Sequence, residues 1–244
     1  MRLRLLLVVL GLLAALPAST FAQTVTDGRV WSGLVIQGRT GSESSWRWSF
    51  DSQFRMRDGL ETADLLSGRG TLSRDLTSRL SLGVGYGIAA GFPAGGGSLV
   101  EHRFHQQLVW TARPAGLSLT LRTRIEQRFL EADDRVALRV RQAVRLSRPL
   151  SAASRLSVFV GDEVMAHSRS TARVARGFDQ HRIFAGIRRT LTQQAALEVG
   201  YANQYLRLQS GTYRMSHVLA VTLSLAAGPG VGSGRGADAP RQTR

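Results

Sequence analysis

The chain of 244 residues contains no cysteine, and arginine supplies all 32 of its basic side chains, so lysine is absent as well. Without cysteine the chain can form neither a disulfide framework nor a thiolate metal site, and the absence suits passage through an oxidising periplasm. After its first 22 residues it also lacks any uncharged apolar run of the roughly 20 residues that a membrane-spanning helix requires. A helical inner-membrane protein is therefore excluded, and the length suits a single domain.

The first 22 residues have the pattern of a signal peptide. Arg2 and Arg4 precede an apolar run over residues 5–16, and small residues follow up to Ala22. This order of a charged, an apolar and a small-residue region predicts export and cleavage before Gln23. An N-terminal anchor that is retained is the alternative. No cysteine follows the cleavage site, so a lipoprotein anchor is excluded.

Arginine is abundant, and its distribution is unusual. The formal net charge is +15, which in a soluble protein would suggest nucleic acid as the partner. Here the arginines do not form a patch but recur at every second residue within apolar segments. We therefore expect no nucleic-acid partner.

Alternation of apolar and polar residues dominates the sequence. Trp48 and Phe50, for example, alternate with Arg47 and Asp51. The clearest segments of this kind are 46–56, 80–89, 101–110, 117–129 and 135–146. A period of two predicts β-strands, and these segments run 10 to 13 residues. Strands in soluble proteins are usually shorter, whereas a strand that crosses a membrane needs about 9 to 11 residues.

The predicted fold is an all-β, antiparallel transmembrane β-barrel of about ten strands over residues 46–227, with twelve strands as the alternative. Short connections alternate with longer ones, as expected for periplasmic turns and external loops, and both ends of the barrel are then periplasmic. Residues 30–38 also read as a strand, but an eleventh strand would break the even count. Residues 23–45 are therefore predicted to be a periplasmic or lumen-entering segment, and residues 228–244 a disordered tail.

In such a barrel the polar face lines the lumen. The residues predicted there are Glu101, Arg103, His105, Arg122, Arg124, Glu126, Arg128, Arg139, Arg141, Glu163, Gln180, Arg182, Arg188, Glu198 and Gln204. One interpretation is a packed ladder of arginine–carboxylate pairs that holds the barrel closed. The other is a lumen that attracts anions, since arginines outnumber carboxylates.

The sequence offers no clear catalytic or metal-binding motif. By alternation His105 and His167 point inward, and the remaining histidines, His102, His181 and His217, point outward. There is no HExxH spacing and no serine on a sharp turn. Three glycines at alternate positions, 83, 85 and 87, read as small lumen residues rather than as a phosphate loop. We expect no catalytic residue, no cofactor and no metal.

Several of these stretches together resemble a known family. They are EHRFHQQLVW from Glu101, RTRIEQRF from Arg122, ALRVRQAVRL from Ala137, FDQHRIFAGI from Phe178 and LEVGYANQY from Leu197. In this order they are similar to the bacterial proteins known as domain-of-unknown-function 2490, regarded as outer-membrane β-barrels. The resemblance covers residues from about 46 to 225. It implies a barrel in the outer membrane of a double-membraned bacterium, and it implies no activity.

The expected function is thus an outer-membrane barrel of unassigned activity, structural or passing small solutes, anions included, and not an enzyme. Its expected partners are outer-membrane lipids and the machinery that assembles outer-membrane proteins. One alternative is an outer-membrane enzyme acting on lipid or lipopolysaccharide, with His181 or Ser216–His217 as candidates. Another is a soluble, secreted β-sandwich that binds an anionic ligand.

Overall fold

The computed structural model describes residues 24–228, except for residues 42, 132 and 152. The predicted signal peptide and residues 229–244 of the predicted tail lie outside the described residues. The strands are β1 (Thr24–Arg39), β2 (Trp46–Arg57), β3 (Thr62–Asp75), β4 (Leu80–Gly91), β5 (Leu99–Ala112), β6 (Ser118–Leu130), β7 (Ala137–Pro149), β8 (Leu156–His167), β9 (Gly177–Thr190), β10 (Ala195–Arg207) and β11 (Tyr213–Ala227). Two short 3₁₀ turns, η1 (Asp58–Leu60) and η2 (Pro114–Gly116), complete the elements. No helix in this part of the chain is long and apolar enough to cross a membrane.

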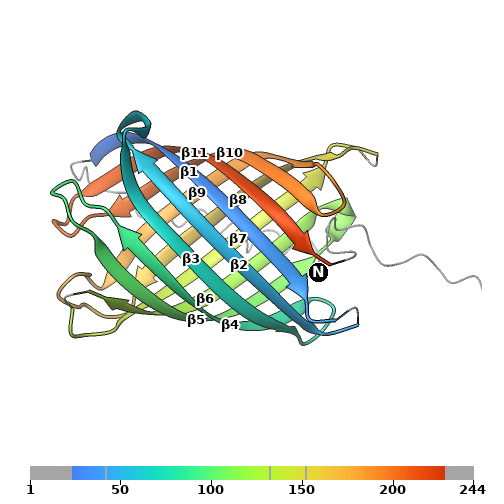
Figure 1. The fold of residues 1–244 in the computed structure, drawn as a ribbon, viewed down its shortest axis with the longest axis horizontal. Helices are drawn as coiled ribbons and strands as arrows, with labels where there is room; N and C mark the ends of the chain where they lie inside the picture. The colour runs from blue at the N-terminus through green and yellow to red at the C-terminus, as the bar shows by residue number, and fades with distance from the viewer. Residues whose placement is uncertain (1–23, 42, 132, 152, 229–244) are drawn as a thin grey trace, which may run out of the picture.

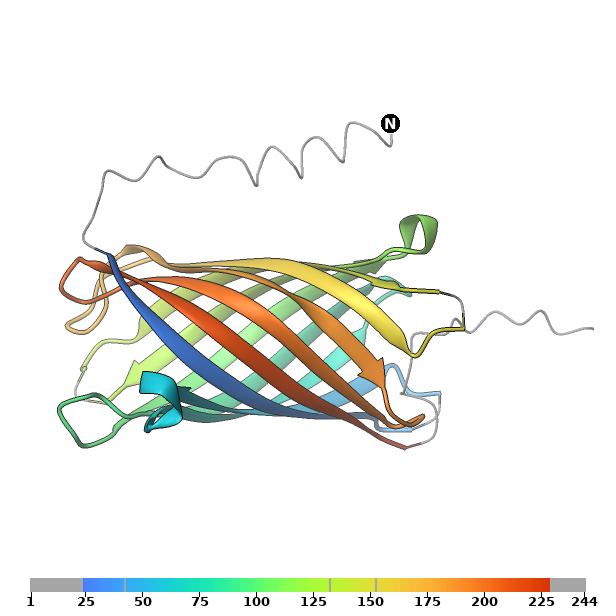
Figure 2. The same ribbon diagram turned by 90° about the horizontal axis from the view of Figure 1, so that it is seen from above.

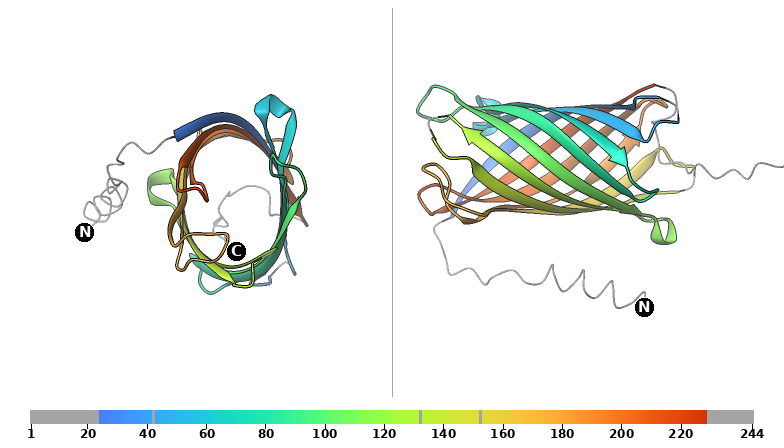
Figure 3. Two further views of the ribbon diagram at one scale, coloured as in Figure 1. Left: turned by 90° about the vertical axis from the view of Figure 1, so that its left-hand side faces the viewer. Right: turned by 90° about the horizontal axis from the view of Figure 1, so that it is seen from below.

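The strands form one closed barrel in which chain neighbours pair antiparallel, as Figure 1 shows. Viewed along its axis the barrel is an oval ring (Figure 3, left). The predicted all-β barrel is confirmed. The barrel has eleven strands, one more than the ten counted from the sequence, because β1 is part of the wall.

The eleventh strand is β1, and it closes the barrel. It pairs antiparallel with β2 and parallel with β11, in register from Thr24 opposite Tyr213 to Gly38 opposite Ala227. The strand predicted at residues 30–38 is therefore present, but its placement outside the wall was wrong. Without β1, strands β2 and β11 would each present an unpaired edge, which costs free energy for every backbone group left without a hydrogen bond.

Because β1 and β11 run parallel, the first strand begins at one end of the barrel and the last strand finishes at the other. We call the end where β1 begins the amino end and the end where β11 finishes the carboxyl end; both can be followed in Figure 2. Connections at the amino end reach nine residues, 168–176, whereas connections at the carboxyl end reach six. The prediction that the barrel begins and ends on the same side was wrong, because β1 starts at the amino end.

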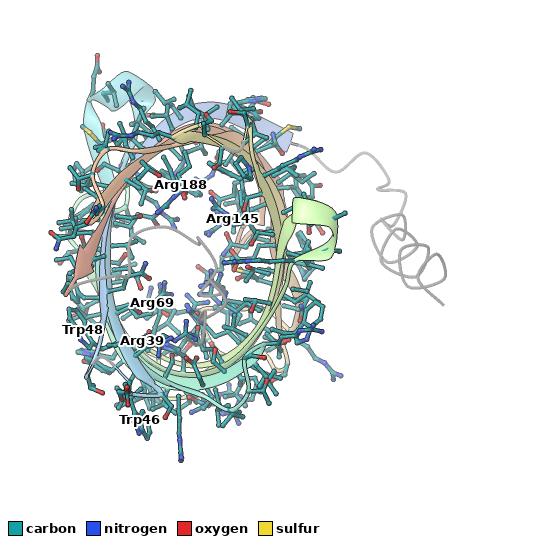
Figure 4. All side chains as sticks on the ribbon, turned by 90° about the vertical axis from the view of Figure 1, so that its right-hand side faces the viewer. Arg39, Trp46, Trp48, Arg69, Arg145 and Arg188 are labelled. Carbon is teal, nitrogen blue, oxygen red and sulfur yellow. The ribbon has the colours of Figure 1, made fainter. Side chains whose placement is uncertain are left out.

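The wall is apolar outside and polar inside. Large apolar side chains in the strands are exposed on the outer surface, for example Phe50 at 44%, Val84 at 54% and Ile187 at 50%. Charged side chains on the opposite face of the wall are buried, among them Arg139 on β7 and Glu163 on β8. Figure 4 shows Trp46 and Trp48 outside the ring and arginines inside it. The alternation in the sequence thus places most buried charged side chains in the barrel interior.

Candidate functional site in the barrel interior

The interior holds a cavity of about 630 Å³. Among the described residues, eleven arginines and six carboxylates line it, an excess of five positive charges. Arg69, Arg145 and Arg188 project from different sides toward the centre of the ring, as Figure 4 shows. The interior is therefore neither filled by side chains nor neutral.

Glu126 on β6 is the centre of the charge network. Its side chain is 2% exposed. Its Oε2 accepts hydrogen bonds from Nε and Nη2 of Arg139, at 2.8 and 2.6 Å. Its Oε1 accepts from Nη1 of Arg141 at 2.8 Å, and Nη1 of Arg124 lies 3.8 Å away. One carboxylate thus compensates the charge of several arginines from two neighbouring strands.

Two further carboxylates extend the network across the wall. Glu163 on β8 accepts from Arg141 at 2.8 Å and from Arg122 at 2.9 Å. Glu101 on β5 accepts bidentate pairs from Arg103 and Arg128. Because these contacts join non-adjacent as well as adjacent strands, they tie β5, β6, β7 and β8 into one polar interior.

The structure places the sequence-predicted lumen residues on the inner face. All of them line the cavity except Arg124, Arg188 and Glu198. Arg124 is buried against the wall, where Oε1 of Gln107 accepts from its Nε and Nη2. Glu198 accepts from Arg145 at 2.8 Å and Arg188 at 2.7 Å.

Strands β1, β2 and β3 also contribute charged side chains to the interior, which are not among the predicted lumen residues. Nη1 of Arg29 donates to Asp64, and Arg69 forms a bidentate pair with Asp51. The alternation over residues 46–56 already places Asp51 on the polar face of its strand, so its inward orientation was predictable from the sequence. Asp179 is different, because it bulges at a register shift between β8 and β9, and a period of two cannot locate a bulge.

The histidines divide between the faces as alternation predicts. His105 is buried against Thr71, and Nε2 of His167 lies 2.7 Å from Nη1 of Arg128. The other three contact polar partners on the outer wall, where His102 meets Tyr86, His181 meets Asp162 and His217 meets Tyr201.

Two observations bear on catalysis and metal binding. Ser216 is fully buried inside the barrel whereas His217 is exposed on the outside, so the two cannot act together on one substrate. Between residues 24 and 228, gaps excepted, no three acidic or histidine side chains are grouped so as to hold a metal ion.

Trp31 on β1 is a buried aromatic residue beneath two arginines. The guanidinium carbon of Arg55 lies 4.1 Å from the centre of its ring, and that of Arg182 lies 5.0 Å away. The indole packs against Ala202, Val218 and Phe184, which fixes its position.

Residues 28–215, from β1 into β11, match the family described as Protein of unknown function (DUF2490). The chain belongs to this family. The whole charge network described above lies within the part that matches DUF2490. An uncharacterised protein of Methylorubrum extorquens is 28% identical over 228 residues, which are 90% of this chain and 96% of that protein. LpxR from Salmonella typhimurium is similar in structure with a TM-score of 0.44 and 11% identity, over 75% of this chain and 85% of that one.

Proposed function

We propose that this DUF2490 protein is a β-barrel of the bacterial outer membrane, that it is not an enzyme, and that its interior passes small solutes with a preference for anions. The observation that carries the proposal is the distribution of polarity, with apolar side chains exposed outside and an arginine-rich cavity inside. A water-soluble protein has its apolar core inside, whereas a membrane barrel has the opposite arrangement.

Aromatic residues near both ends of the wall support a membrane location. Trp46 and Trp48 begin β2 at the carboxyl end. At the amino end, Tyr205 and Tyr213 stack with ring centres 4.9 Å apart. Aromatic girdles of this kind lie at both interfaces of membrane barrels. The alternative β-sandwich is wrong, because the strands close into one barrel.

The two interpretations of the interior are compatible. Ion pairs centred on Glu126 and Glu163 satisfy the buried charges of the wall. Arg145 and Arg188 are about one-third exposed and share a single carboxylate, Glu198. An excess of positive charge enclosed by a low-dielectric wall raises the local concentration of anions, so the lumen would favour anions over cations.

Ion conductance in planar bilayers tests this proposal. The purified barrel should give discrete conductance steps, and its reversal potential in a KCl gradient should show selectivity for chloride. Replacing Arg145 and Arg188 together by alanine should reduce that selectivity while the barrel still folds. The matched control is Arg189→Ala, because Arg189 is the next residue and is exposed on the outer face. A folded wild-type barrel that gives no conductance steps would overturn the proposal.

One observation favours the enzymatic alternative. Asp162 and His181 form an outward-facing pair with oxygen and nitrogen 2.6 Å apart, and a carboxylate beside an imidazole can orient a general base. If the protein cleaves lipid or lipopolysaccharide, then product should form with purified wild-type barrel and disappear with His181→Ala. Our proposal predicts no turnover for either protein.

A further inference from the structure

The cluster of Trp31, Arg55 and Arg182 contains positive charge that the protein does not compensate. Of the eleven arginines that line the cavity in the described chain, ten have a carboxylate oxygen within 4.0 Å, and Arg55 has none. Nε and Nη2 of Arg55 both donate to Oε1 of the neutral Gln53, at 2.9 and 2.6 Å. The Nη1 group of Arg55 is left for another acceptor.

Arg182 on β9 is only partly compensated. Its Nη1 lies 3.5 Å from Oε2 of Glu163, a carboxylate that already accepts from Arg122 and Arg141. Its Nη2 donates to the neutral Gln180 at 2.9 Å. Its Nε is buried and has no hydrogen-bond partner within the described residues. Two guanidinium groups beside the same indole therefore both have unused donors.

We propose that this cluster is a binding site for a compact oxyanion, a phosphoryl or carboxylate group held between Arg55 and Arg182 at the cavity surface. A guanidinium group presents a planar set of donors that matches the oxygens of both groups. A buried charge without a partner is costly, so an anion that supplies the partner binds favourably. Arg55 and Arg182 both line the cavity, so the site is open to a solute in the lumen.

Trp31 positions the site. Its ring attracts both cations through its π face, which holds two like charges near each other although they repel. Gln53 accepts hydrogen bonds from Arg55 and Gln180 accepts one from Arg182. Both acceptors are neutral amides, so these bonds leave the positive charge of the cluster uncompensated. The sequence places these residues on β1, β2 and β9, and the wall brings them together only once the barrel has closed through β1 and β11.

Titration calorimetry on the folded, detergent-solubilised full barrel tests the site. Inorganic phosphate, sodium acetate and sodium chloride are added separately at constant ionic strength. We expect saturable binding of phosphate or acetate and none of chloride, and the stronger of the two identifies the phosphoryl or the carboxylate source. Arg55→Gln and Arg182→Gln should each weaken that binding at least about tenfold, since a hydrogen bond to a charged group contributes roughly 1.5–3 kcal/mol.

The matched control is Arg74→Gln. Arg74 also lies over an indole, with its guanidinium carbon 5.7 Å from the ring centre of Trp46, but Trp46 is on the outside of the barrel (Figure 4). This variant should bind as the wild type does. Arg55→Lys keeps the charge and serves if Arg55→Gln does not fold; it should bind more weakly than wild type because it has lost the planar donors.

The proposal is overturned if the wild-type barrel shows no saturable binding of either oxyanion. It is also overturned if folded Arg55→Gln and Arg182→Gln bind as tightly as Arg74→Gln. Binding and passage are measured separately. A barrel that binds phosphate in micelles but conducts no ions retains this site and loses only the proposed solute passage.

Discussion

At the residue scale, the interior depends on a few carboxylates surrounded by many arginines. Glu126 alone contacts three of them, with Arg139 and Arg141 at hydrogen-bonding distance. Buried ion pairs contribute little net stability compared with an apolar replacement of both partners, but removing one partner leaves an uncompensated charge. The acidic residues should therefore tolerate substitution far less than the arginines that are exposed to the cavity.

Glu126→Gln tests this asymmetry. We expect a loss of about 3–5 kcal/mol in the free energy of unfolding, because the guanidinium groups of Arg139 and Arg141 would then face a neutral amide in a buried site. Urea unfolding in micelles, followed by the change of gel mobility without heating, measures it. Glu43→Gln is the control, because Glu43 is exposed in the connection between β1 and β2. Equal stability of the two variants would show that the ion pairs do not hold the wall.

Gly85 lies against the buried ring of His105, and this contact gives a second prediction at the residue scale. A Cβ atom at Gly85 would lie 2.4 Å from Cε1 of His105 and 2.3 Å from the carbonyl oxygen of Gly70. Gly85→Ala should therefore lower the free energy of unfolding by about 1–3 kcal/mol through overpacking. Gly70→Ala meets nothing within 4 Å and is the matched control in the same urea experiment. If the two variants are equally stable, His105 does not pack on β4 as described.

Alternation predicted which residues face inward but not which of them meet. A period of two fixes the face of every regular strand residue, so Glu101, Glu126 and Glu163 could be assigned to the interior from the sequence. The contact of Trp31 with Arg182 joins β1 to β9, which are not neighbours in the chain or in the wall. Such a contact depends on barrel diameter and strand stagger, which local patterns do not contain.

At the element scale, β1 shows how a correct local prediction can be misplaced. The strand over residues 30–38 was recognisable, because its alternation is local. Its place in the wall conflicted with the even strand number of most bacterial barrels, so it was assigned outside. The parallel register of β1 with β11 joins residues almost 190 positions apart, and no sequence pattern within either strand specifies that pairing.

The absence of cysteine allows a direct test of this pair. Leu34 lies opposite Leu223 in the parallel register, and neighbouring strands are about 5 Å apart, within the range of a disulfide. The double variant Leu34→Cys/Leu223→Cys should form an intramolecular disulfide on mild oxidation, seen as a reducible shift in gel mobility. Leu34→Cys/Leu219→Cys is the control, because Leu219 lies opposite Val30. Equal cross-linking in both would contradict the register.

The connections at the amino end are linked by Asp133. Its carboxylate accepts hydrogen bonds from the backbone N–H groups of Arg135 and Arg173, so it joins the connection after β6 to that after β8. A hydrogen bond with the Thr171 side chain, together with these N–H donors, holds the pKa of Asp133 below its ordinary value of 3.8.

This link gives a prediction of pH dependence. Because the folded-state pKa of Asp133 is lowered, the link is fully present above pH 3.8 and is lost as the pH falls through the lowered value. At neutral pH, Asp133→Ala should therefore speed proteolytic cleavage within residues 168–176, as measured by mass spectrometry of the fragments. Asp134→Ala is the neighbouring control. Equal cleavage rates in the two variants would show that Asp133 does not join these connections.

At the scale of the whole molecule, the outward placement of the apolar side chains decides which solvent the barrel requires. Val84, in the central part of β4, is 54% exposed on the outer surface. In a bilayer, arginine at such a central position costs about 2–4 kcal/mol, and much less near the interface. Val84→Arg should therefore destabilise the barrel in lipid vesicles far more than Leu76→Arg, whose site is in the connection after β3. If both variants unfold at the same urea concentration in vesicles, the outer face does not contact acyl chains.

The parallel pairing of the first and last strands limits how the chain could be circularly permuted. In a barrel with an even number of strands the two ends of the wall lie side by side, and a loop of a few residues could join them in a circular permutant. Here the start of β1 and the finish of β11 lie at opposite rims. A linker would have to traverse roughly 35 Å, the height of strands of this length at the usual tilt, either through the lumen or along the outside. Permuted chains with short linkers should therefore fail to close, although each strand retains its own sequence.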